Sequence, residues 1–134
     1  MFWVAAMAAV VAAATGLAQT RETVERTIWD GVYTSEQADR GQLALQQRCT
    51  ACHADSEWSS ATFVNRWAGR SILTLYDNIR LTMPYNAPAR LSREEYSDIV
   101  ASMLRLNGAP PGDAPLPNDV EGLQHIAVTP KGDR

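Results

Sequence analysis

Cys49-Thr50-Ala51-Cys52-His53 is the most informative segment of this chain of 134 residues. Two thiols three positions apart match the separation of the two vinyl groups of a porphyrin, and a histidine directly after them faces the central metal. The spacing Cys-x-x-Cys-His is therefore typical of covalent c-type haem attachment. The sequence predicts one haem c, bound through thioethers to Cys49 and Cys52, with His53 as an axial ligand of the iron.

Zinc binding and dithiol redox chemistry are the alternative uses of this cysteine pair. A closed zinc site needs four ligands, and beyond Cys49, Cys52 and His53 the only other Cys or His in the chain is His125. A thioredoxin-like dithiol is accompanied by alternating strands and helices, which the helical periodicity of this chain does not provide. Haem is therefore the preferred interpretation.

Residues 2–18 form an apolar, uncharged segment of the length of a secretory signal. Small residues at 16–18 suit cleavage, so the mature chain is expected to begin near Gln19. The segment lacks the Lys or Arg that usually opens a signal, and its length reaches the lower end of a membrane span, so a retained anchor is the alternative. We expect a periplasmic protein, anchored to the membrane only if residues 1–18 remain.

The net charge of −3 disfavours nucleic acid and anionic membrane surfaces as partners. The basic residues are eleven arginines and one lysine, Lys131, so a lysine-rich docking surface cannot form. Between residues 53 and 91 four arginines outnumber three acidic residues. We expect redox partner proteins to bind a weakly polarised surface that carries arginines, in complexes of modest salt dependence.

Four helices and no strand are expected from the hydrophobic periodicity. The first begins at the Thr-x-x-Gln capping box of residues 34–37 and runs to Arg48, directly before the cysteine pair. The second covers residues 60–67, and the third opens at Ser71 with apolar residues at helical spacing. The fourth begins at the Ser-x-x-Glu box of Ser92. Its apolar stripe is the clearest in the chain and consists of Tyr96, Ile99, Val100, Met103 and Leu104.

The fourth helix is expected to end at residues 107–108, an Asn followed by a Gly, and two prolines soon after prevent its continuation. All seven prolines lie from Pro84 onward. At most a short helical turn is expected after that helix, within residues 120–126. Residues 19–106 are therefore expected to form the main domain, and 107–134 a proline-rich C-terminal extension.

Met83 is the candidate for the second axial ligand of the iron. It follows the third helix, and Pro84 stiffens the turn that presents its thioether, a soft neutral ligand that raises the reduction potential. Met103 lies on the apolar stripe and is expected to be part of the core, whereas His125 in the extension is expected to be solvated. The predicted axial pair is His53 and Met83.

The chain resembles the class I (monohaem) cytochromes c over residues 29–106. The resemblance rests on a capped helix that leads into the Cys-x-x-Cys-His motif, the Met-Pro pair at 83–84 and a final capped helix. It implies an all-α, cytochrome c-like fold of about three to five helices around one covalent haem. It also implies that Gly41 lets the last helix approach the first. The family often has Ala followed by an aromatic residue at the position of Ala-Ser 101–102.

In that family a proline carbonyl soon after the motif often accepts the second ring N–H of the iron-bound histidine. This chain has no proline between residues 53 and 83, so the acceptor for His53 stays open. Trp67, Arg70, Tyr76 and Tyr85 suit contact with the haem ring or pairing with a propionate, although large aromatic residues at helical spacing more often belong to the core.

Short stretches at 31–38, 83–85 and 106–110 are similar to bacterial periplasmic cytochromes c that serve dehydrogenases. The expected function is a one-electron carrier between a periplasmic dehydrogenase and an oxidase or other cytochrome, an electron-transfer protein and not an enzyme. One alternative is a tightly bound cytochrome c subunit of a larger oxidoreductase, with the extension as its clasp. Another is a gas-binding or peroxidatic haem protein, which would need an open iron site.

Overall fold

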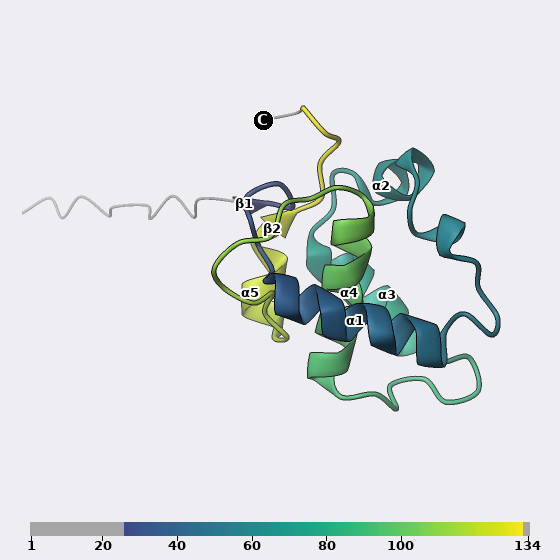
Figure 1. Cartoon of the computed structure of the whole chain (residues 1–134). Coiled ribbons are helices and arrows are strands. Elements are labelled where there is room, and N and C mark those ends of the chain that lie inside the picture. The colour runs from purple at the N-terminus through teal and green to yellow at the C-terminus, as the bar shows by residue number, and fades with distance from the viewer. Residues whose placement is uncertain (1–25, 133–134) are drawn as a thin grey trace, which may run out of the picture.

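The computed structural model describes residues 26–132 (Figure 1). The fold is all-α, as predicted, and the four predicted helices correspond to α1–α4. In chain order the elements are β1 Arg26–Thr27, α1 Ser35–Arg48, a 3-10 turn Asp55–Glu57, α2 Ala61–Trp67, α3 Ile72–Thr82, α4 Arg93–Leu106, α5 Val120–Gln124 and β2 Ile126–Ala127. The expected signal segment, residues 1–18, lies outside the described residues. Within residues 26–132 no helix is long and apolar enough to cross a membrane.

Side-chain caps begin α1 and α4 where the sequence predicts them. Thr34 accepts the N–H of Gln37, and Ser92 and Glu95 form a reciprocal capping box. The second hydrogen bond of the first predicted capping box, from the Thr34 N–H to the Gln37 side chain, is wrong, because that side chain points into the core. Gln37 is 2% exposed, and its side chain accepts the N–H of Leu116 at 2.7 Å and donates to the carbonyl of Leu116 at 3.1 Å. A buried amide needs partners for both its donor and its acceptor, and the C-terminal segment supplies them.

The helices α1 and α4 cross in close contact (Figure 1). Gly41 lies at the crossing, where an added Cβ would stand 1.7 Å from the carbonyl oxygen of Asp98. Only glycine therefore permits the two backbones to approach this closely. The prediction that Gly41 admits the last helix is confirmed.

Arginine side chains link the two helices at the edges of the crossing. Arg40 binds the carboxylate of Asp98 through two hydrogen bonds of 2.8 and 2.9 Å, and Arg105 donates to Asp39 at 2.6 Å. Asp98 is 5% exposed, so its charge requires a partner of this bidentate kind. Both ion pairs connect α1 to α4 and hold the register of one helix on the other.

The segment that follows α4 packs into the main core. The hydroxyl of Tyr33 donates to the carbonyl of Ala109, and the N–H of Gly112 donates to the carbonyl of Tyr33. The buried apolar residues of this segment are Ala109, Leu116, Leu123, Ile126 and Val128. The expected short helical turn near the end of the chain is α5.

The strands β1 and β2 form a parallel ladder, with Arg26 opposite Ile126 and Thr27 opposite Ala127. The prediction that the chain has no strand is therefore wrong. Two residues are too few for alternation of apolar and polar side chains to show in a sequence, and each strand finds its partner at the other end of the chain.

We predict that Gly41→Ala lowers the free energy of unfolding by about 3 kcal/mol, because its methyl group overlaps the Asp98 carbonyl. Gln46→Ala, at an exposed position of the same helix, is the control and changes it by less than about 0.5 kcal/mol. Urea unfolding followed by circular dichroism measures both. A Gly41→Ala protein as stable as the wild type would show that the two backbones do not meet there.

Candidate functional site

Cys49, Cys52 and His53 lie in one tight turn at the C-terminal end of α1. The N–H of Cys49 donates to the carbonyl of Leu45, and the N–H groups of Cys52 and His53 donate to the carbonyl of Cys49 at 3.1 and 3.0 Å. Both thiols are free, with Cys49 half-buried and Cys52 exposed. Burial raises the pKa of the Cys49 thiol. The turn therefore presents two thiols and an imidazole from the end of a single helix.

The imidazole of His53 is held through one of its two ring nitrogens. Nδ1 lies 3.0 Å from Oε2 of Glu57, and the described part of the chain places no hydrogen-bond partner at Nε2. The other oxygen of Glu57 accepts the N–H of Ala54 at 3.0 Å. The hydrogen bond from His53 and, after it, the one from Ala54 hold the pKa of Glu57 below its ordinary value. This arrangement leaves Nε2 of His53 available to a metal.

Met83 is positioned by α3 and by α4. It is the residue at which α3 ends, and its N–H donates to the carbonyl of Ile79 at 2.8 Å. Its own carbonyl accepts the hydroxyl of Tyr96 at 2.7 Å. The loops that follow α1 and α3 lie on the same side of the molecule in Figure 1.

A small apolar cluster borders both loops. Its buried members are Leu45, Trp58, Ile99 and Met103. Cys49 packs against this cluster, and so does Ile79, one helical turn before Met83. The two segments that carry the predicted ligands therefore share one apolar surface.

The alternative ligands lie elsewhere in the fold. His125 follows α5, on the opposite side of the molecule in Figure 1 from the end of α1. Met103 is 5% exposed inside the apolar cluster, as expected of a core residue. Among residues 26–132, no group of three or more His, Cys, Asp or Glu side chains is placed to hold a metal ion. The four zinc ligands considered from the sequence are therefore not brought together.

Two tryptophans carry buried N–H groups that no atom of residues 26–132 accepts. Trp58 and Trp67 are 6% and 9% exposed, and neither Nε1 has a hydrogen-bond partner within the described residues. Buried donors nearly always have a partner. The hydroxyls of Ser102 and Thr129 are also unpartnered, but a hydroxyl rotates, whereas an indole N–H is fixed by its ring. The ring of Trp58 lies beside that of His53, with centroids 5.6 Å apart, so its N–H suits a bound group with acceptor oxygens, as haem has in its propionates, whereas Trp67 belongs to the main core.

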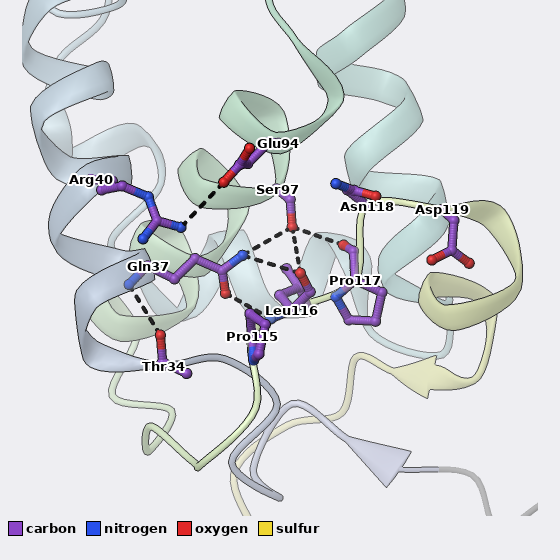
Figure 2. Close-up of a pocket in the computed structure, with 10 residues that line it drawn as sticks. All are labelled: Thr34, Gln37, Arg40, Glu94, Ser97, Pro115, Leu116, Pro117, Asn118 and Asp119. Atoms are coloured by element: carbon purple, nitrogen blue, oxygen red, sulfur yellow. Dashed lines mark hydrogen bonds and ion pairs between the residues drawn. The ribbon is translucent and has the colours of Figure 1, made fainter.

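A separate cavity of about 450 Å³ lies away from these residues, between the start of α1, the start of α4 and the C-terminal segment (Figure 2). Gln37 and Ser97 border it, and both bind the carbonyl of Leu116. Their polar atoms are satisfied by the protein, so these contacts fix the C-terminal segment in place. None of Cys49, Cys52, His53 and Met83 lines this cavity.

The fold and the site define a class of protein, the c-type cytochromes. The family model described as cytochrome C oxidase, cbb3-type, subunit III matches residues 36–103, a range that includes Cys49, Cys52, His53 and Met83. The chain belongs to this family, whose cytochrome c domain transfers electrons through haem and is not itself an enzyme. No curated protein matches the chain, and no solved structure does.

Three contributions to the site were not predicted from the sequence. Glu57 was not recognised as the partner of His53, Trp58 was not named, and Tyr96 was predicted only as a core residue. The spacing of four residues between His53 and Glu57 is a signal in a helix, but this segment shows no helical periodicity. The contact of Tyr96 with Met83 depends on how α3 and α4 pack, which no local pattern reports.

We predict that Tyr96→Phe loosens the Met83 loop, because it removes the only hydroxyl that binds the Met83 carbonyl among the described residues. The free energy of unfolding falls by about 1 kcal/mol. Hydrogen exchange becomes faster in residues 83–92. Tyr33→Phe is the matched control, since it removes the hydroxyl bound to Ala109 and speeds exchange in residues 107–117 instead. Equal exchange in residues 83–92 of the two variants contradicts the prediction.

Proposed function

We propose that this protein is a periplasmic one-electron carrier with one covalent haem c. The observation that carries the proposal is the turn at the end of α1, which presents two free thiols and an imidazole whose Nε2 has no partner among the described residues. This turn lies within the range that matches a cytochrome family. No acid, base or nucleophile is needed for electron transfer, so these residues have binding roles only.

Each of four residues has one role in holding the haem. Cys49 and Cys52 would hold it through thioethers, and His53 and Met83 would hold the iron through Nε2 and the thioether sulfur. When bound, the haem supplies a ferric/ferrous couple that accepts or gives one electron. The soft, neutral thioether of Met83 favours the ferrous state, which supports a high reduction potential.

The surroundings of the site favour fast transfer. The buried indole of Trp58, beside His53, excludes water and offers an N–H donor to a propionate. The hydrogen bond from Tyr96 holds the Met83 backbone in one position. A dry site with fixed ligands changes little between oxidation states, so little reorganisation accompanies the gain or loss of an electron.

The surface near Met83 suits a transient partner. Tyr85 is 89% exposed and Leu81 is 57% exposed, so both apolar side chains are free to contact another protein. The segment 53–91 has one more arginine than acids. We therefore propose brief complexes with a periplasmic dehydrogenase as donor and an oxidase or other cytochrome as acceptor, with modest dependence on salt.

The second candidate is a permanent subunit of a larger oxidoreductase. It is favoured by the description of the matching family, which names a subunit of an oxidase. The two candidates differ in size-exclusion chromatography of the periplasmic fraction or of mildly solubilised membranes. A free carrier elutes as a monomer, whereas a subunit elutes with its partner chains. The same cofactor chemistry serves both candidates.

Covalent attachment is the first test. Wild-type protein made in a host that matures c-type cytochromes should keep its haem after denaturation and acid-acetone extraction. Cys49→Ala or Cys52→Ala should leave one thioether, with a pyridine haemochrome band shifted to longer wavelength, and the double variant should lose its haem on extraction. A denatured wild-type chain that is colourless, with two free thiols, would refute the proposal.

The second test assigns the sixth ligand. Oxidised wild-type protein should show the weak near-infrared band of sulfur-to-iron charge transfer, and Met83→Ala should lose it and bind carbon monoxide when reduced. Met103→Leu, a change of similar volume inside the apolar cluster, is the control and should keep the band. Persistence of the band in Met83→Ala would exclude Met83 as the ligand, and rapid carbon monoxide binding by the wild type would favour a gas-binding haem.

A further inference from the structure

Glu57 is bound on both of its carboxylate oxygens within the loop that carries His53. Oε2 lies 3.0 Å from Nδ1 of His53, and Oε1 accepts the N–H of Ala54 at 3.0 Å. The 3-10 turn Asp55–Glu57 brings the carboxylate back toward the start of its own loop. The carboxylate is therefore fixed in direction as well as in distance.

This contact selects the form of the imidazole that a metal requires. An iron bound through Nε2 needs the lone pair of that nitrogen, so the ring proton must lie on Nδ1. The carboxylate of Glu57 accepts that proton in a hydrogen bond and stabilises this tautomer. No proline lies between residues 53 and 83, and Glu57 is the acceptor that the structure places at Nδ1.

An exposed ion pair four residues apart contributes little to stability on average. The side chains of His53 and Glu57 are 31% and 53% exposed, so a stabilising role would be small. The hydrogen bond from His53 to Glu57 affects a bound metal in another way, because it changes the electron density of the imidazole that binds the metal.

We propose that Glu57 is a positioning residue that orients His53 and lowers the reduction potential of the haem. The inference rests on the proposed function, since it takes His53 as an axial ligand. A negatively charged acceptor draws the Nδ1 proton toward itself and raises the electron density on Nε2. The richer ligand stabilises ferric iron more than ferrous iron, so the potential is lower than with a neutral acceptor.

The test compares Glu57→Gln with Asp55→Asn in haem-loaded protein. Both changes remove one negative charge from the same exposed 3-10 turn, but only Glu57 contacts His53. At a fixed solution potential, Glu57→Gln raises the ratio of ferrous to ferric protein about tenfold, which corresponds to about 59 mV for one electron. Asp55→Asn raises it less than about threefold, as expected for a solvent-screened charge.

Three outcomes overturn the inference. Equal changes in the ferrous-to-ferric ratio of the two variants would show that Glu57 acts only as a surface charge, as Asp55 does. The absence of a shift in Glu57→Gln, or a shift toward the ferric state, would exclude the electronic effect. In each case intact thioethers and an intact near-infrared band would leave the proposed function standing, so the two failures are distinguishable.

A measurement on the wild type keeps the inference testable if Glu57→Gln folds poorly. In ferrous, diamagnetic protein with ¹⁵N-labelled histidine, the Nδ1 proton of His53 should be visible and shifted downfield by a charged acceptor. Its signal should persist in Asp55→Asn. An Nδ1 proton that exchanges with water at the rate of a free imidazole would overturn the inference.

Discussion

The backbone contact between Gly41 and Asp98 is the constraint on which the rest of the structure depends. It joins α1 to α4 without a side chain that could adjust, so the relative position of the two helices is fixed. Cys49 follows Gly41 on α1 by about two helical turns, and Tyr96 precedes Asp98 on α4 and binds the Met83 carbonyl. One contact between two helices therefore fixes the turn that carries Cys49 relative to the hydroxyl that binds the Met83 carbonyl.

Local signals were sufficient to predict most of the helices and the cysteine motif. A side-chain cap such as that of Thr34 or Ser92 acts on an N–H three residues away, so it is visible in a short stretch of sequence. The same is true of residues 49–53, whose spacing is typical of a c-type haem attachment site. Gly41 was predictable only through the family resemblance, since a glycine inside a helix does not say what approaches it.

What could not be predicted depends on residues that are distant in sequence. Gln37 has the spacing of a capping box, but the backbone of Leu116 offers its side chain a buried donor and acceptor. The side chain therefore binds Leu116 and not the N–H of Thr34. The ladder of β1 and β2 likewise joins the two ends of the described chain. Glu57 is the exception, because it is close to His53 in sequence and was missed only because a 3-10 turn has no periodicity to recognise.

Of the four polar residues that the structure buries among residues 26–132, Gln37, Ser97 and Asp98 have protein partners, whereas the hydroxyl of Ser102 has none. At the crossing of α1 and α4, the buried groups Gln37 and Asp98 have full sets of protein partners. Trp58 and Trp67 lie between His53 and Met83 in the sequence, and their indole N–H groups have no partner among residues 26–132. The helix α3 belongs to the same helical frame as α1 and α4, because its residues Ile72, Leu75 and Tyr76 are part of the main core. The loop between α1 and α2 instead buries only Trp58, and its only regular structure is the 3-10 turn that places Glu57 against His53.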